Sequence, residues 1–252
     1  YNYLDIRKEL ELRGYVFKTE TDTEVVLTSY LYWGERCLDK FNGMFAFAIW
    51  DRLSKRLFCA RDRLGVKPFY YFYNNGKFAF ASEIKPLLDL GMINKEPNNQ
   101  AIWDYLVNGY VEHTNQTFFN NVYKLMPGYY FYVSMEDGIQ AFQYWDISIN
   151  DRIGNTNDSP RVINEFRILL KDSVKLRLRS DVPVGSCLSG GLDSSSIVCL
   201  VNGFVKEKPQ GLLIGERQKT FSSCFEDLRF DERKYIEVIT QHTLADKKYI
   251  FP

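Results

Sequence analysis

Histidine is almost absent from this 252-residue chain, which contains only two, His113 and His242. We therefore do not expect a catalytic triad or a metal site built on histidine. The cysteines are few, odd in number and without a Cys-x-x-Cys pair, which argues against a zinc site and against a disulfide framework. Unpaired thiols fit a reducing compartment, so we expect a cytoplasmic protein. The cysteines are Cys37, Cys59, Cys187, Cys199 and Cys224.

The chain also lacks an excess of charge, because 32 Lys and Arg balance 32 Asp and Glu. Nothing marks a nucleic-acid or membrane surface, and we expect neither as a partner. The apolar runs are too short to span a bilayer, and no signal peptide is visible. The chain starts at Tyr1, inside an expected helix, and stops at Pro252, directly after an expected strand, so we expect a fragment of a longer protein.

Aromatic residues are abundant, at 16% of the chain, and concentrate in the first half. They favour β-rich packing there. The turn Asn75-Gly76 between two aromatic runs predicts a hairpin. We expect helices at 4–12, 22–33, 83–90 and 99–107, and strands at 15–18, 43–51, 56–61, 69–73, 77–82, 129–133 and 139–145.

The second half alternates strands with helices, which predicts a parallel α/β sheet. A polar stretch separates the halves, so we expect domains at 1–146 and 159–252 joined by a linker at 147–158. The expected helices are 159–178, 193–204 and 231–242, and the expected strands are 182–188, 220–225 and 247–251. The strand 182–188 is mostly apolar, which is typical of a buried strand.

The stretch Ser189-Gly-Gly-Leu-Asp-Ser-Ser195 follows that strand and precedes a helix. Two glycines allow a sharp turn, and the helix N-terminus directs free N–H groups at one spot, which favours a phosphate. No Gly-Lys-Ser/Thr follows, so this is not a Walker loop. Taken alone, Gly190-Gly191 could also be a plain turn with serine caps. The whole stretch resembles the pyrophosphate loop of ATP pyrophosphatases.

Asp22 lies inside an expected capping box, Thr21-Asp-Thr-Glu24, at the start of a helix. A carboxylate at that end is explained by the helix dipole alone. The residues by themselves therefore leave a ligand role for Asp22 open.

Six further stretches, in the same order along the chain, resemble the glutamine-hydrolysing asparagine synthetase family. They are Gly43-Met-Phe-Ala-Phe-Ala48, Arg61-Asp-Arg-Leu-Gly-Val-Lys-Pro68, Ala81-Ser-Glu-Ile-Lys-Pro86, Leu125-Met-Pro-Gly128, Tyr144-Trp-Asp146 and Ser180-Asp-Val-Pro-Val-Gly185. The resemblance implies an α+β N-terminal-nucleophile glutaminase domain with stacked antiparallel sheets, followed by the start of an α/β parallel-sheet ATP pyrophosphatase domain. It also implies ATP-dependent asparagine synthesis, in which glutamine supplies ammonia to an aspartyl-adenylate.

The resemblance assigns roles to individual residues. It implies that Asp22 binds the α-amino group of glutamine and that Asp193 helps to bind Mg²⁺. Cys187 and Ser223 match positions that touch the adenosine of ATP through backbone atoms, although Ser223-Cys-Phe225 departs from the usual Ile-Gly-Phe. The catalytic N-terminal cysteine of the family matches none of the five cysteines here, so we expect the fragment to be inactive. The expected ATP-binding residues are Cys187, Ser189, Gly190, Gly191, Asp193, Ser194, Ser195 and Ser223.

Two other readings remain open. Relatives that adenylate another carboxylate, such as β-lactam synthetases, peptide cyclases and amidotransferases acting on sugar precursors, share the glycine loop. A non-catalytic homologue that binds ATP is the third possibility. The expected small-molecule partners are glutamine, aspartate and ATP, and a homodimer is one of the states that the sequence leaves open.

Overall fold

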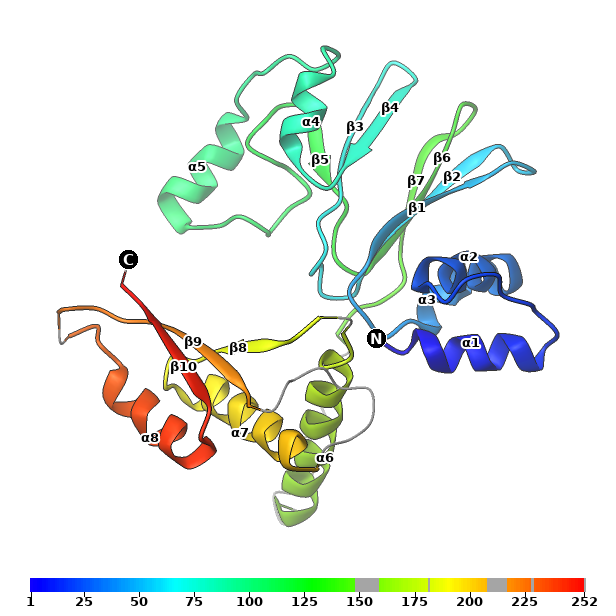
Figure 1. The fold of residues 1–252 in the computed structure, drawn as a ribbon. Coiled ribbons are helices and arrows are strands. Elements are labelled where there is room, and N and C mark those ends of the chain that lie inside the picture. The colour runs from blue at the N-terminus through cyan, green and yellow to red at the C-terminus, as the bar shows by residue number, and fades with distance from the viewer. Residues whose placement is uncertain (148–158, 181, 208–216, 228, 252) are drawn as a thin grey trace. The chain divides into compact units, whose positions relative to one another are not determined.

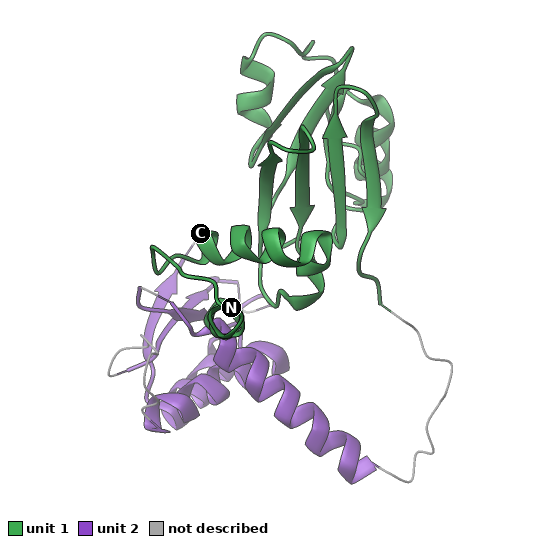
Figure 2. Cartoon of the chain, turned by 90° about the vertical axis from the view of Figure 1, so that its right-hand side faces the viewer, with its two compact units in different colours: residues 1–149 green, residues 150–252 purple. Residues whose placement is uncertain are grey.

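The computed structural model describes residues 1–147, 159–180, 182–207, 217–227 and 229–251. The chain divides into two compact units, residues 1–149 and residues 150–252 (Figure 2). Except for its first residue, the expected linker 147–158 lies outside the described residues. Within the described ranges, no helix combines the length and the apolar character needed to cross a membrane.

The first unit contains a four-stranded antiparallel sheet with the order β1-β2-β6-β7 (Figure 1). Its central strands are buried on both faces by alternating side chains. Phe58 and Tyr132 pack against helices, whereas Cys59 and Phe131 pack against the second sheet. The strands are β1 (Ala46–Asp51), β2 (Arg56–Arg61), β6 (Tyr129–Ser134) and β7 (Gly138–Gln143).

A second antiparallel sheet has the order β4-β3-β5. Its strands are β3 (Tyr70–Asn74), β4 (Lys77–Ala81) and β5 (Val122–Lys124). The β3–β4 turn confirms the predicted hairpin, because Asn75 and Gly76 both have positive φ, at 49° and 72°. Tyr71 and Phe78 contact Phe131 of the first sheet, so aromatic side chains fill the space between the two sheets.

Helices cover the outer faces of both sheets. The first sheet is covered by α1 (Tyr3–Leu12), α2 (Asp22–Trp33) and the short α3 (Cys37–Lys40), whose apolar residues share one core with Phe58. The second sheet packs its other face against α4 (Ile84–Asp89) through Leu87 and Phe72. Helix α5 (Asn99–Asn108) precedes the loop that leads to β5. The unit is therefore layered helix–sheet–sheet–helix, and the stacked antiparallel sheets expected from the resemblance are present.

The strand predicted at 15–18 is not formed, because a helix side chain binds this backbone instead. The Glu24 carboxylate accepts hydrogen bonds from the amides of Lys18 and Thr19, at 2.8 and 2.7 Å. Thr21 does cap the Glu24 amide, as predicted, at 3.4 Å. The Glu24 carboxylate therefore binds the amides of Lys18 and Thr19 rather than the Thr21 amide expected in a capping box, and it fixes the chain that leads into α2. These hydrogen bonds lower the pKa of the Glu24 carboxyl.

The second unit contains a three-stranded parallel sheet with the order β10-β9-β8. The parallel arrangement confirms the prediction from alternating strands and helices. Helix α7 packs on α6 through Val201 and Phe204, and on α8 through Val198 and Ile236. The elements are α6 (Ser159–Arg177), β8 (Gly185–Cys187), α7 (Leu192–Glu207), β9 (Lys219–Ser223), α8 (Arg233–Thr243) and β10 (Asp246–Ile250).

Two predictions for this unit are wrong in detail. The strand expected at 182–188 is only three residues long, and Gly185 and Cys187 are exposed. Helix α6 ends at Arg177, one residue before the expected end, and of its residues only Val174 is buried, whereas Phe166 is 65% exposed. The spacing of apolar residues along the sequence thus predicts the helix correctly but does not determine which of its side chains are buried.

Candidate functional site

An open cleft lies at the N-terminus of α2 in the first unit. Its volume is about 420 Å³, and α2, the start of β1 and the segments flanking the β3–β4 hairpin form its walls. Its lining combines charged and polar side chains with apolar ones, which suits a small ligand with a charged group. The side chains that define it are Asp22, Thr23, Met44, Phe45, Lys67 and Ser82.

Asp22 is the first residue of α2 and is exposed to the cleft. Among the described residues, its carboxylate has one hydrogen-bond donor, Thr23 Oγ1 at 3.4 Å. Both oxygens can therefore accept hydrogen bonds from a ligand. Asp22 is held in place by the backbone of α2, whose start is fixed by Thr21 and Glu24. The geometry suits recognition of an ammonium group.

Asp62 organises the loop that brings Lys67 to this cleft. Its carboxylate is buried and accepts hydrogen bonds from four backbone amides, at 2.9 to 3.2 Å. The donors are Phe45, Leu64, Val66 and Lys67. Two charged residues of the segment 60–69, Arg61 and Asp62, are therefore buried rather than solvated.

The neighbouring Arg61 is also buried. Its guanidinium donates hydrogen bonds to the carbonyls of Lys67, Gly65 and Leu125, at 2.8, 2.7 and 2.7 Å. A planar guanidinium with five donors can join three chain segments in this way. Arg61 and Asp62 thus build one wall of the cleft without lining it. In the sequence, the feature that could have identified these two residues is their position as a charged pair at the end of a strongly predicted strand.

The predicted phosphate loop lies in the second unit, between β8 and α7. Ser194 Oγ accepts a hydrogen bond from the Ser189 amide at 3.2 Å and lies 3.0 Å from Ser189 Oγ. The Gly191 amide in turn donates to Ser189 Oγ at 3.4 Å. Ser195 Oγ is buried and has no hydrogen-bond partner within the described part of the chain. A buried hydroxyl without a partner is costly, and a bound anion would satisfy it.

Two hydrogen bonds hold the start of the loop on the sheet. The Leu188 amide donates to the Phe221 carbonyl at 2.9 Å, and Ser222 Oγ donates to the Leu188 carbonyl at 2.7 Å. The loop therefore leaves the sheet at the carboxyl end of β8, the edge at which open α/β sheets bind ligands. The first amides of α7 face outward from a helix and lack intrahelical acceptors. The structure thus brings Ser189, Gly190, Gly191, Asp193, Ser194 and Ser195 together in one turn.

Cys187 and Ser223 are the last residues of the adjacent parallel strands β8 and β9. Both are exposed at the edge that carries the phosphate loop. Asp193 is exposed in the first turn of α7. Among the described residues, no group of three or more His, Cys, Asp or Glu side chains could hold a metal ion. A single carboxylate beside the predicted phosphate loop still suits Mg²⁺, which commonly takes one carboxylate together with phosphate oxygens.

Comparison with known proteins identifies the first unit. The family described as "Glutamine amidotransferase domain" matches residues 1–145. The chain belongs to this family. A second family, described as "Asparagine synthase", matches residues 165–251. The two matches fall on the two structural units, 1–149 and 150–252.

Two relatives of this amidotransferase chain are asparagine synthetases (glutamine-hydrolyzing) of Bacillus subtilis. One is 39% identical over 82% of this chain, and the other is 37% identical over 92% of this chain. The chain spans 33% and 34% of the lengths of these relatives. A solved structure of glutamine phosphoribosylpyrophosphate amidotransferase from Bacillus subtilis matches 98% of this chain and 43% of that chain, with 12% identity and a TM-score of 0.41.

The amidotransferase unit contains two cysteines, Cys37 and Cys59, and both have no exposed surface. Burial, together with the carboxylates of Glu35 and Asp39, raises the pKa of the Cys37 thiol to about 12. Burial also raises the pKa of the Cys59 thiol. Because the thiolate is the nucleophile, neither residue is prepared for catalysis at neutral pH.

Gly190 provides a prediction with a matched control inside the loop 189–195. Its φ is +83°, and a Cβ atom there would lie 2.7 Å from Tyr235 Cβ and 3.2 Å from the Ile236 amide nitrogen. We expect Gly190→Ala to lower the free energy of unfolding of the second unit by about 2–3 kcal/mol, from backbone strain and overpacking. Urea unfolding followed by circular dichroism measures it.

Gly191→Ala is the control, because its Cβ would meet nothing closer than Ser189 Oγ at 3.5 Å, and its φ is not positive. This variant should unfold at nearly the wild-type urea concentration. Equal destabilisation by the two substitutions would show that Gly190 is not packed against α8 as described.

Proposed function

We propose that the chain is part of a glutamine-dependent asparagine synthetase. The observation that carries the proposal is that one chain joins a glutamine amidotransferase unit, with a carboxylate exposed in its cleft, to a parallel-sheet unit with a Ser-Gly-Gly loop at its ligand-binding edge. The overall reaction would convert ATP, aspartate and glutamine into AMP, pyrophosphate, asparagine and glutamate. The domains would be residues 1–146 and 159–252, with 147–158 as their linker.

In the first unit we assign the cleft to glutamine. The Asp22 carboxylate would bind the α-ammonium group, because it is exposed, negatively charged and, among the residues that the structure describes, bound only to Thr23. The helix–sheet–sheet–helix layering supports an N-terminal-nucleophile glutaminase. We assign no catalytic nucleophile within residues 1–252, since both thiols of this unit are buried. The five free thiols fit the cytoplasm.

In the second unit we assign the loop 189–195 to ATP, as in an ATP pyrophosphatase. The first amides of α7 and the hydroxyls of Ser189, Ser194 and Ser195 would bind the phosphates that leave as pyrophosphate. Backbone groups of Cys187 and Ser223 would contact the adenosine, because both residues end strands beside the loop. Asp193 would hold Mg²⁺, which supplies positive charge to neutralise the phosphates.

The chemistry that follows has two steps. The side-chain carboxylate of aspartate attacks the α-phosphorus of ATP, and the bond to pyrophosphate breaks. Ammonia released from glutamine then attacks the acyl carbon, and AMP leaves with the bonding electron pair. In this scheme the loop stabilises the charge that develops on the leaving pyrophosphate.

The deciding experiment supplies the full-length protein with ATP, Mg²⁺, aspartate and glutamine and measures all products. Asparagine and glutamate formed together with AMP and pyrophosphate are the expected result. Glutamate without aspartate-dependent pyrophosphate would instead indicate another acceptor. Absence of both products would favour a carboxylate-adenylating relative that needs no ammonia, or a protein that only binds ATP.

Cys187 offers a direct test of the ATP assignment. Only Cys187 and Cys199 are exposed among the five thiols, so iodoacetamide should modify these two in the folded chain. We expect Mg-ATP to slow the alkylation of Cys187 by about tenfold or more, because the nucleotide would cover the end of β8. Mass spectrometry of the modified peptides measures both rates.

Cys199 is the internal control for this prediction. It lies on α7, beyond the loop, and its alkylation should be unchanged by ATP. Equal rates for Cys187 with and without ATP, at a concentration that saturates the protein, would contradict the proposed adenosine site.

A further inference from the structure

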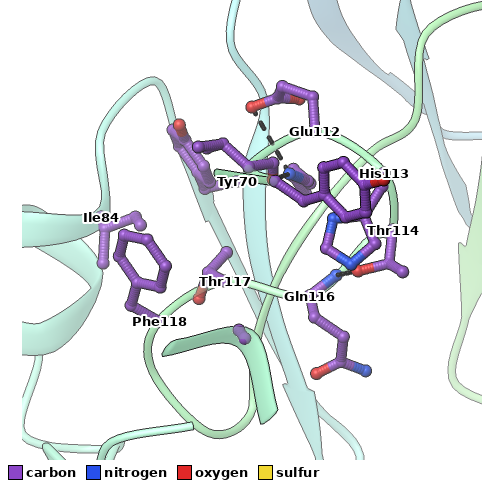
Figure 3. A pocket seen from close by; sticks show the side chains of 12 residues that line it. Tyr70, Ile84, Glu112, His113, Thr114, Gln116, Thr117 and Phe118 are labelled. Carbon is purple, nitrogen blue, oxygen red and sulfur yellow. Dashed lines mark hydrogen bonds and ion pairs between the residues drawn. The ribbon is translucent and has the colours of Figure 1, made fainter. Parts of the chain in front are cut away.

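A second cavity of the amidotransferase unit shares no residue with the Asp22 cleft. It has a volume of about 120 Å³, which is smaller than the roughly 300–1,000 Å³ of sites for drug-sized ligands. The loop between α5 and β5 forms one side of it, and β3 and α4 contribute to the other (Figure 3). It therefore suits a small molecule.

The polar side of this cavity contains an incompletely satisfied ion pair. The side chain of Lys124 is only 4% exposed, yet its Nζ atom lies 3.4 Å from Glu112 Oε1. The Glu112 side chain is 58% exposed and has no other partner within the described residues. The second acceptor of the Lys124 ammonium is the Val111 carbonyl.

Both charges retain hydrogen-bonding capacity. An ammonium has three donors, and the described residues provide this one with two acceptors. A carboxylate has about four acceptor sites, and that of Glu112 uses one. A positive and a negative group with spare capacity thus lie side by side on one wall of the cavity.

The opposite wall is apolar. Ile84 and Phe118 lie across the cavity from Glu112 and His113 (Figure 3). The imidazole of His113 is fixed by Asp104 of α5, with Nε2 and Oδ2 2.9 Å apart. A ligand of this cavity would therefore bring its charged end to the loop and a short uncharged end to Ile84 and Phe118.

From these contacts we infer that the cavity binds a small zwitterionic α-amino acid. Its carboxylate accepts the free N–H of Lys124, and its ammonium donates to Glu112. In an α-amino acid the ammonium and the carboxylate are both attached to the same carbon atom. These neighbouring ligand charges match the neighbouring charges of Glu112 and Lys124 on one wall of the cavity. The site is additional to the glutamine cleft and does not depend on the function proposed above.

The test uses the imidazole NMR signals of the 252-residue chain, which has two histidines. A His242→Gln variant assigns them, and an Asp22→Asn background removes binding in the other cleft. Asparagine, glutamine and leucine are titrated. We expect at least one to shift the His113 signal saturably, with a Kd of about 1 mM or tighter, and to leave the His242 signal in place.

Charge-deleted ligands and variants complete the test. Succinamate lacks the ammonium of asparagine and β-alaninamide lacks its carboxylate, and each should bind at least about tenfold more weakly than asparagine. Glu112→Gln, on an exposed side chain, should weaken amino-acid binding about tenfold, and Lys124→Met should abolish it. If Lys124→Met does not fold, Glu112→Gln decides. No saturable shift of His113, or equal binding of succinamate, would overturn the proposal.

Discussion

Replacing Asp22 by Asn is expected to lower kcat/KM for glutamine hydrolysis by the full-length protein by about 100-fold or more. The substitution keeps the size of the side chain but removes the charge that we assign to the α-ammonium group of glutamine. Truncating one partner of a close charge pair commonly costs about 2–5 kcal/mol, which corresponds to this loss. Glutamate formation at several glutamine concentrations measures it.

The same variant should keep its fold. Asp22 is exposed, and the described residues give it one hydrogen bond, from Thr23, so its melting temperature should stay close to that of the wild type. Glu20→Gln is a suitable control, because Glu20 is an exposed acid on the same segment and does not line the cleft. If Asp22→Asn hydrolyses glutamine at the wild-type rate, Asp22 does not bind the substrate.

Replacing Asp62 by Ala is expected to destabilise the first unit by about 3–5 kcal/mol. Four partly buried backbone amides would lose their common acceptor, a carboxylate on a residue that is only 1% exposed, and unsatisfied donors at such a place are costly. The loop that carries Lys67 would lose its support as well. The free energy of unfolding in urea, followed by the fluorescence of the tryptophans, measures the loss.

Asp51→Ala is the matched control for this substitution. Asp51 also accepts backbone hydrogen bonds, from Leu53 and Ser54, at 2.9 and 3.2 Å, but it does so in an exposed turn. We expect a loss of about 1 kcal/mol or less, since water can replace the carboxylate there. Comparable losses for the two variants would mean that the hydrogen bonds of Asp62 contribute no more than those of a surface turn.

Local patterns predicted the parts of the fold that depend on neighbouring residues. Asn75-Gly76 identified its hairpin because positive φ at two successive positions is a local requirement. The glycine turn before α7 was placed correctly for a similar reason, and Gly190 does adopt positive φ. Parallel pairing of β8, β9 and β10 followed from the helices between them, because parallel strands need long crossover connections.

Features that depend on distant residues were missed or mispredicted. The strand β5 has only three residues, which is too few to show an alternation of polar and apolar side chains, yet it positions Lys124 in the second cavity. Arg61 and Asp62 were not predicted to be buried, because charged residues are buried only where specific partners exist, and Leu125 is one of those partners. The segment 15–18 was expected to be a strand, but Glu24 binds its backbone.

The shared acceptor at Asp62 also determines how this part of the chain exchanges its amide hydrogens with deuterium. The amides of Phe45, Leu64, Val66 and Lys67 are all bonded to one carboxylate, so a single opening of the loop releases them together. Their exchange should therefore report one opening equilibrium with a common free energy rather than four independent ones. That equilibrium also sets the fraction of time for which this wall of the Asp22 cleft is open in the native protein, so the exchange of these four amides measures how completely the cleft is assembled.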